Sequence, residues 1–120
     1  MIALRHVTLD CRDPGALAAF WSAALDRPLD EGAGPFFASI GMGVRSRQPA
    51  WLFLKVPEGK SAKNRMHVDF STDDRATEVE RLVALGATAQ GEHDEFGTRW
   101  TVLADPEGNE FCVGMPSTTG

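Results

Sequence analysis

Two histidines and one glutamate are the residues of this chain best suited to chemistry. His6 and His67 each begin a short run of the form His-Val, with an acidic residue within four positions. Glu110 begins the last strand-like run of the sequence. Two neutral imidazoles and one carboxylate can hold a divalent cation and leave positions open for a substrate. The same residue types are also common as ordinary core or surface groups, so the pattern needs a second observation.

An internal repeat supplies that observation. His67 lies 61 residues after His6, and Asp74 lies 61 residues after Asp13. A helical pattern follows each histidine-bearing run. Such a repeat in a chain of 120 residues predicts two half-chain modules, each beginning with a His-bearing strand. If a local two-fold axis relates the modules, the two imidazoles converge near that axis.

The predicted metal ligands are therefore His6, His67 and Glu110. Imidazole and carboxylate suit Zn, Ni, Co, Mn or Fe, and the spacing does not choose among these metals. No local ligand motif of the HExxH type is present. The alternative interpretation is two ordinary histidines and an exposed glutamate.

A fourth ligand should come from the first module's last strand, residues 51–56, as the counterpart of Glu110. We assign Trp51, Phe53 and Lys55 to the cavity face of that strand by alternation, and none of them is a carboxylate. Either the site has three protein ligands, or no metal binds and the cleft is an aromatic-lined pocket.

Further residues are expected to line the cleft. Asp69 shares strand parity with His67, and Cys112 shares it with Glu110. Aromatic walls are expected from Trp51, Phe53 and Trp100.

The linker between the modules, residues 57–64, has the composition of a turn or hinge and carries Lys60 and Lys63. It is either a solvated linker or an anion site at the mouth of the cleft.

The predicted elements repeat the order β-α-β-β-β in each module. Asp13 and Pro14 are suited to begin a helix over 15–25, and Gly86 is suited to end a second helix over 75–85. Further strands are expected at 36–41, 51–56, 87–90, 98–103 and 110–114. Residues 43–48 form a turn or a weak strand, and residues 92–97 form an acidic loop that contains His93.

These elements predict an α+β fold. Two paired βαβββ modules, residues 1–59 and 64–116, form one domain over 1–120, with a curled mixed sheet around a cleft and the helices outside.

Composition limits the partners of this domain. Hydrophobic residues make up 42% and charged residues 24% of the chain, which is ordinary for a soluble globular protein. A net charge of −5 argues against a nucleic-acid-binding surface, which needs a basic stripe. Neither a signal-peptide pattern nor an apolar run of about 20 residues occurs. Cys11 and Cys112 form no CxxC pattern and indicate reduced thiols. We expect a cytoplasmic protein with a small-molecule partner and no nucleic acid or membrane partner.

Three stretches resemble the vicinal oxygen chelate (VOC) superfamily. His6-Val7-x-Leu9, followed by Asp13-Pro14, resembles the opening of that superfamily. The run Lys-Asn-Arg-Met-His-Val-Asp at 63–69 resembles the module junction of its glyoxalase-like branch. The turn Leu-Ala-Asp-Pro-Glu-Gly-Asn-Glu at 103–110 resembles its closing motif and is the most specific of the three. The similarity covers nearly the whole chain.

The resemblance implies paired βαβββ modules and, usually, a homodimer. The superfamily includes glyoxalase I, extradiol dioxygenases, methylmalonyl-CoA epimerase, fosfomycin-resistance enzymes and bleomycin-binding proteins. In its metal-dependent enzymes the ligands lie at positions matching His6, His67 and Glu110. The remaining ligand falls in the strand 51–56, where this chain departs from the pattern. Glu110 can still serve as a catalytic base.

Two functions follow as hypotheses. The first is a metal-dependent isomerase, lyase or dioxygenase, in which a divalent metal polarises adjacent oxygens of a small metabolite and stabilises an enediolate or similar anion. The second is a metal-free binding protein of the bleomycin-resistance kind, which sequesters an aromatic or cationic compound. The acidic net charge and the missing fourth ligand favour the second. In both cases we expect a C2 homodimer.

Overall fold

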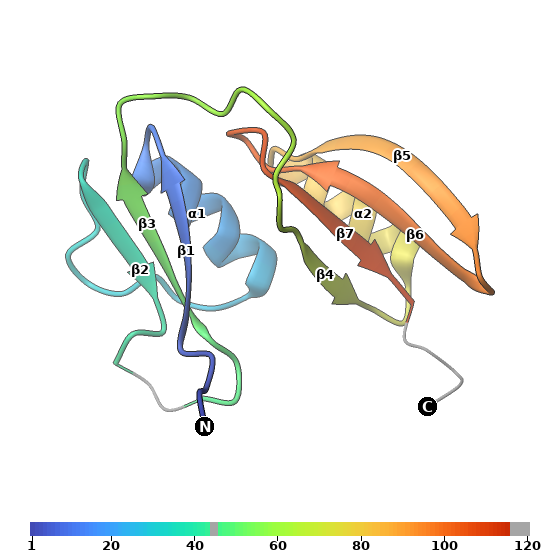
Figure 1. The fold of residues 1–120 in the computed structure, drawn as a ribbon, viewed down its shortest axis with the longest axis horizontal. Helices are drawn as coiled ribbons and strands as arrows, with labels where there is room; N and C mark the ends of the chain where they lie inside the picture. Colours follow the sequence, from blue (N-terminus) through green and yellow to red (C-terminus); the bar gives the residue numbers. More distant parts are fainter. Residues whose placement is uncertain (44–45, 116–120) are drawn as a thin grey trace. The chain divides into compact units, whose positions relative to one another are not determined.

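The computed structural model describes residues 1–43 and 46–115 (Figure 1). The chain divides into two compact units, Met1–Lys60 and Ser61–Gly120. Each unit combines one helix with one mixed β-sheet. The α+β class predicted from the sequence is therefore confirmed. The expected end of the second module, residue 116, lies outside the described residues.

Unit 1 is built around a central strand. Its elements are β1 (His6–Cys11), α1 (Pro14–Leu25), β2 (Phe37–Ile40) and β3 (Ala50–Lys55). In this sheet β3 lies in the middle, parallel to β1 and antiparallel to β2. Leu29 forms an isolated antiparallel bridge with Ile40 of β2. The strand predicted at 36–41 is β2, whereas no strand was predicted at Leu29.

Unit 2 has the complete βαβββ order that the sequence predicts. Its elements are β4 (Val68–Ser71), α2 (Arg75–Leu85), β5 (Thr88–Glu95), β6 (Thr98–Ala104) and β7 (Glu110–Gly114). The strands lie in the order β4-β7-β6-β5, with β4 parallel to β7 and the other neighbours antiparallel.

The two sheets share strand order and register. Val7 pairs with Trp51 across the parallel pair of unit 1, and Val68 pairs with Phe111 across that of unit 2. One residue earlier, His6 pairs with Ala50. The internal repeat seen in the sequence therefore extends to residue pairing.

Both helices begin with an aspartate cap. The Asp13 carboxylate accepts from the Ala16 N–H at 3.2 Å, and Pro14 occupies the first turn. Asp74 accepts from the Thr77 hydroxyl at 2.7 Å and from its N–H at 3.2 Å. These two hydrogen bonds lower the pKa of Asp74. Each cap fixes the point where the chain leaves its His-bearing strand and enters the helix.

The core of unit 1 lies between its sheet and α1. The ring centroids of Trp21 and Trp51 are 4.7 Å apart, and Phe53 is fully buried. Val7 is the neighbour of Trp51 in the parallel register, so both side chains lie on the face of the sheet that packs against α1. The face predicted for β3 is thus wrong: Trp51 and Phe53 form the core, and the side chains on the His6 face of β3 are Ala50, Leu52 and Leu54.

The core of unit 2 uses alternate residues of its two inner strands. Leu103 of β6 and Phe111 of β7 are at most 2% exposed, and Leu82 of α2 is also buried. The ring of Phe70 meets that of Phe111 edge-on, with centroids 6.0 Å apart. Because strands alternate, the other residues of β6 and β7 face away from this core.

The β5–β6 hairpin corrects a second prediction. Residues 92–95 continue β5 as a paired strand rather than forming an acidic loop, with a bulge between Ala89 and Gly91. His93 pairs with Trp100, and the two rings stack at 5.2 Å. Phe96 and Gly97 form the turn, with φ values of 57° and 73°. All eight residues of β5 are exposed. The strand therefore has no buried face, and its sequence shows no alternation of apolar and polar residues.

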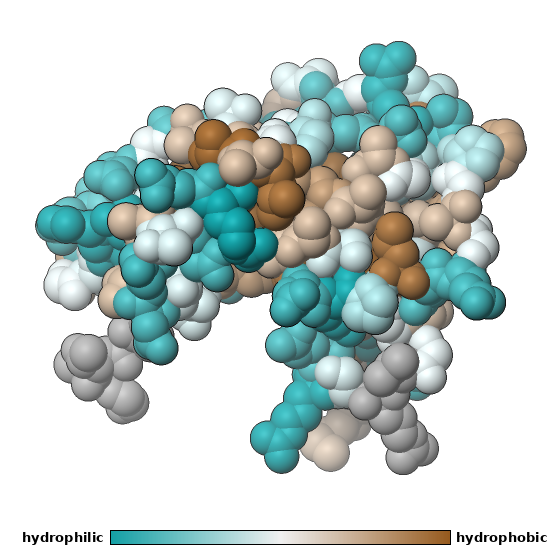
Figure 2. Space-filling view, turned by 180° about the vertical axis from the view of Figure 1, so that it is seen from behind, coloured by the Kyte–Doolittle hydropathy of each residue, from teal (hydrophilic) through white to brown (hydrophobic). Residues whose placement is uncertain are grey.

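Several large hydrophobic side chains remain on the surface of each unit. Phe36 is 73% exposed in unit 1, and Met66 and Phe96 are 84% and 96% exposed in unit 2. Figure 2 shows hydrophobic residues grouped among hydrophilic ones on the face drawn there. Such groups are common at sites of protein association.

Two further predictions concern the remaining segments. The described part of 43–48 contains turns and bends, while residues 44 and 45 lie outside the described residues. Cys11 and Cys112 carry unbridged thiols, as expected. Within residues 1–43 and 46–115, no helix has the length and apolar character needed to span a membrane.

Candidate functional site

Unit 2 carries a pocket of about 330 Å³ on the sheet face that points away from its core. This volume falls at the lower end of the range for small-molecule sites. The lining residues all belong to unit 2: Lys63, His67, Asp69, Trp100, Val102, Glu110 and Cys112. Five of them were predicted from the sequence as site residues.

Strand alternation and parallel pairing explain why these side chains meet. Glu110 and Cys112 share one face of β7, whereas Phe111 between them enters the core. In β4, Asp69 lies directly beside Cys112. His67 precedes β4 by one residue, which by the same register brings it beside Glu110. Four potential ligands therefore occupy two neighbouring pairs on one face.

An aromatic wall closes one side of the pocket. Val102 of β6 pairs with Cys112, and Trp100 pairs with Gly114. Because Gly114 has no side chain, the Trp100 indole meets no side chain from that neighbour. His93 stacks on Trp100 with an interplanar angle of 17°. The wall offers an apolar surface suited to an organic ligand.

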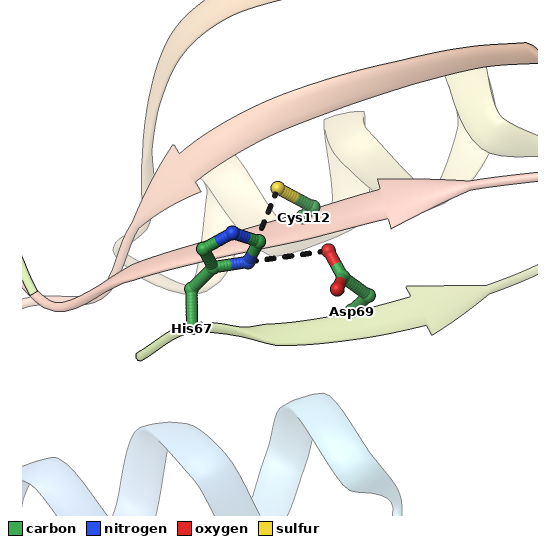
Figure 3. A group of neighbouring side chains, drawn as sticks. All are labelled: His67, Asp69 and Cys112. Carbon is green, nitrogen blue, oxygen red and sulfur yellow. Dashed lines mark hydrogen bonds and ion pairs between the residues drawn. The ribbon is translucent and has the colours of Figure 1, made fainter. Parts of the chain in front are cut away.

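His67, Asp69 and Cys112 form the tightest group in the pocket (Figure 3). The His67 Nδ1 atom lies 3.3 Å from Asp69 Oδ1 and 3.9 Å from Cys112 Sγ. The three ligand atoms all lie within 4.8 Å of one another. The thiol is buried, whereas the side chains of His67 and Asp69 are 41% and 67% exposed. The group therefore opens to the pocket on one side.

The thiol of this group is strongly perturbed. Burial, followed by the hydrogen bond and the negative charge of Asp69, raises the pKa of Cys112 to about 11. The positive charge of Lys63 lowers this pKa and offsets part of the effect. Without a cation the side chain is a neutral thiol near pH 7.

Two segments of the chain fix the position of Glu110: the end of the linker at Asn64 and the turn before β7. The Glu110 Oε2 atom accepts a hydrogen bond from the Asn64 N–H at 3.0 Å. The preceding turn is organised by buried Asp105, whose Oδ1 accepts from the N–H groups of Glu107 at 2.9 Å and Asn109 at 3.0 Å. Gly108 supplies the positive φ of 91° that this turn requires. The turn thereby fixes the start of β7, whose first residue is Glu110.

The remaining predicted residues belong to unit 1. His6 is exposed at the start of β1, and Trp51 and Phe53 lie in the core. In unit 1 the residue beside His6 is Ala50, and in unit 2 the residue beside His67 is Glu110. Ala50 is therefore the structural counterpart of Glu110. Unit 1 therefore has no carboxylate at this position.

Sequence reasoning missed two contributors to the pocket. Val102 shares strand parity with Trp100, and that signal was available in the sequence. The Asn64 N–H is a backbone donor, and no residue type announces it.

The residues present fit a divalent cation. The pocket offers one imidazole, the carboxylates of Asp69 and Glu110 and the sulfur of Cys112, against a single ammonium group, Lys63. Nitrogen, oxygen and sulfur donors of this kind suit first-row transition metals and zinc.

Comparisons with known proteins agree with this architecture. A family model described as a glyoxalase-like domain matches residues 6–114. No curated protein matches the chain. Among solved structures, a glyoxalase/bleomycin resistance protein/dioxygenase family enzyme from Burkholderia phytofirmans is 21% identical, with a TM-score of 0.77 and coverage of 95% of this chain and 98% of that chain.

Two further solved structures share the fold. A mutant of the fosfomycin resistance protein FosX from Listeria monocytogenes, complexed with Mn(II) and 1S,2S-dihydroxypropylphosphonic acid, is 17% identical. Its TM-score is 0.79, with 98% of this chain and 94% of that chain covered. Lactoylglutathione lyase from Agrobacterium tumefaciens is 19% identical, with a TM-score of 0.67 and coverage of 96% and 94%.

Proposed function

Because the chain belongs to the glyoxalase-like domain family, we propose that it is a metal-dependent enzyme acting on a small oxygenated molecule. The reaction is of the isomerase, lyase or dioxygenase type. The observation that carries the proposal is the pocket of unit 2, which gathers an imidazole, two carboxylates and a thiol beside an aromatic wall. The FosX complex with Mn(II) and a small phosphonic acid supports metal dependence, and the lactoylglutathione lyase from Agrobacterium supports the lyase type.

His67 and Glu110 would hold the cation, and His6 is the third ligand that the sequence repeat predicts. A bound cation supplies Lewis-acid polarisation of substrate oxygens. The carboxylate of Glu110 is the group that takes or returns a proton, because it lines the pocket and the Asn64 N–H holds it in place.

Other residues bind and enclose the substrate. Trp100 and Val102 exclude water from one side of the pocket and pack against carbon atoms of the ligand. The Lys63 ammonium group favours a substrate that carries a negatively charged or strongly polar substituent.

The test is an assay of the full chain after removal of metal and reloading with Zn, Ni, Co, Mn or Fe(II). Substrates are the hemithioacetal of a 2-oxoaldehyde, for the isomerase and lyase types, and an aromatic diol, for the dioxygenase type. We expect turnover of one of them, lost in Glu110→Gln and kept in Glu58→Gln, an exposed linker residue that makes the same chemical change. Turnover that is equal in the two variants would contradict the assignment of Glu110.

A second function is favoured by Ala50, which leaves unit 1 without the counterpart carboxylate. In this alternative the protein binds an aromatic or cationic compound without metal, using the stacked His93–Trp100 wall and the acidic side chains of the pocket. Thermal unfolding with a panel of such compounds separates the two functions. Stabilisation that persists in excess chelator, without turnover of any substrate, supports binding and contradicts the enzyme proposal.

A further inference from the structure

We propose that Asp69 and Cys112 join His67 as metal ligands, and that the cation of this pocket is therefore a thiophilic one, Zn²⁺ or Cd²⁺. The inference rests on the proposed function in that it concerns the metal of the same pocket. It adds two ligands to that site, and with them the chemical class of the cation.

The positions of the three side chains follow from one register. His67 and Asp69 are two residues apart and share a face of the chain at the start of β4. Cys112 lies directly beside Asp69 on the parallel neighbour β7. Adjacent positions on one sheet face bring side chains within contact distance, so no loop movement is needed to assemble the group.

The distances match a coordination site. Zinc bonds of about 2.0–2.3 Å place the ligand atoms of a tetrahedral site about 3.3–3.7 Å apart. His67 Nδ1 lies 3.3 Å from the Asp69 oxygen and 3.9 Å from the Cys112 sulfur, and the third separation is within 4.8 Å. Shifts of a few tenths of an ångström to about 1 Å would bring all three to these values.

The donor types select the metal. On binding, the Cys112 S–H bond breaks, its proton leaves to solvent, and the sulfur bonds to the cation. A thiolate and a carboxylate then neutralise the two positive charges. Thiolate sulfur prefers zinc and softer cations, whereas Mg²⁺ and Mn²⁺ prefer oxygen. Two other charged groups line the pocket: the carboxylate of Glu110, the ligand proposed above, adds a further negative charge that favours the cation, and the ammonium group of Lys63 opposes binding.

Cobalt spectroscopy tests the sulfur ligand directly. Co²⁺ is titrated into the chelator-treated, reduced full chain, and thiolate-to-cobalt charge-transfer absorption is followed in the near ultraviolet. We expect this band in the wild type and in Cys11→Ser, which removes the other cysteine of the chain. Since Cys11→Ser leaves Cys112 as the single thiol, the assignment does not depend on the folding of a Cys112 variant.

Competition and a second variant extend the test. Zn²⁺ and Cd²⁺ should displace cobalt, and Mn²⁺ in large excess should not. Cys112→Ser should lose the band and weaken zinc binding by at least roughly 10- to 100-fold, the loss known for removal of even an outer partner of a metal ligand. Its circular dichroism should match that of the wild type.

The outcomes separate this inference from the proposed function. Cobalt that binds at His67 without a thiolate band, or with equal affinity in Cys112→Ser, overturns the inference and leaves the proposed function standing. A chain that binds none of the cations contradicts both. A thiolate band without turnover of any substrate supports the inference and contradicts the enzyme.

Discussion

Asp105 is the residue that connects the stability of unit 2 to its site. Its buried carboxylate accepts hydrogen bonds from Glu107 and from both the backbone and the side chain of Asn109, immediately before Glu110. Removing a buried group that satisfies several donors leaves those donors unpaired. The position of the Glu110 carboxylate therefore depends on a side chain, Asp105, that is not among the residues lining the pocket.

We predict that Asp105→Ala lowers the free energy of unfolding by roughly 3 kcal/mol and also weakens metal binding. Urea unfolding and a metal titration measure the two effects. Asp94→Ala is the matched control, since Asp94 forms an exposed ion pair with Arg99 and its loss should cost less than about 1 kcal/mol. Equal losses in the two variants would show that the turn does not depend on Asp105.

Asp30 gives a prediction that depends on pH. Its carboxylate accepts from Ser39 Oγ at 2.7 Å, Met42 N at 2.9 Å and Gly41 N at 3.2 Å. Burial raises the pKa of Asp30, but these hydrogen bonds and the charge of Arg27 together lower it below 3.8. Because the folded pKa is depressed, the stabilisation is present above the unfolded pKa and is lost as pH falls through the folded value.

Asp30→Ala should therefore cost roughly 1–2 kcal/mol of unfolding free energy near neutral pH. The difference between variant and wild type should stay constant down to about pH 5 and shrink below about pH 4. Urea unfolding at a series of pH values measures it. A difference that grows as the solution is acidified would show that the pKa of Asp30 is raised, not lowered, by folding.

At the residue scale the sequence predicted faces only where polar residues marked them. In β1, His6, Thr8 and Asp10 alternate with apolar neighbours, and the burial of this strand follows the same alternation. In β3, apolar residues occupy both faces over residues 50–54. Alternation therefore could not indicate which face of this strand is buried. The core position of Trp51 is decided by packing against Trp21 of α1, which is a tertiary contact that no local pattern contains.

At the element scale the clearest failure concerns β5. Its second half is composed of charged and polar residues, and the strand lies at the sheet edge with every residue exposed. Local composition indicated a loop, whereas pairing with β6 makes a strand. By contrast, the bounds of α2 and β7 agree with the prediction, because cap and turn residues mark them.

The turn of this hairpin gives a prediction at the same scale. Gly97 has a φ of 73°, a conformation that costs about 1–2 kcal/mol for a residue with a Cβ. Gly97→Ala should therefore lower the thermal midpoint of unit 2. Gly91→Ala is the control, because Gly91 lies in the same strand pair, lacks a positive φ and has open space around it. A midpoint that falls as far in the control would attribute the loss to the strand instead of the turn.

At the scale of the whole molecule, the repeat was the most informative feature of the sequence. It predicted two modules of the same order, and the shared registers of the β1–β3 and β4–β7 pairs agree with it. It did not decide whether residues 43–48 form a weak strand or a turn, and the described residues of that stretch form turns and bends. The isolated bridge between Leu29 and Ile40 was not predicted, because residues 29–36 hold no alternating apolar pattern.

We propose that the protein is a C2 homodimer. β1 and β4 are edge strands of their sheets, and large hydrophobic residues are exposed in both units. Unpaired edges and exposed hydrophobic groups are commonly covered by association. Light scattering at micromolar concentration should give twice the mass of the 13.0 kDa chain. A mass equal to one chain over that concentration range would refute the dimer.

The most direct test of the account is calorimetric titration of chelator-treated, untagged protein with Zn, Ni, Co, Mn and Fe(II). We predict saturable, stoichiometric binding of at least one cation. His67→Ala should weaken it by roughly 100-fold or more. His93→Ala removes an imidazole that stacks on Trp100 and is not one of the proposed metal ligands, so it should leave the metal affinity unchanged. Absence of saturable heat with every cation, or equal affinity in His67→Ala and His93→Ala, would contradict a metal site at His67.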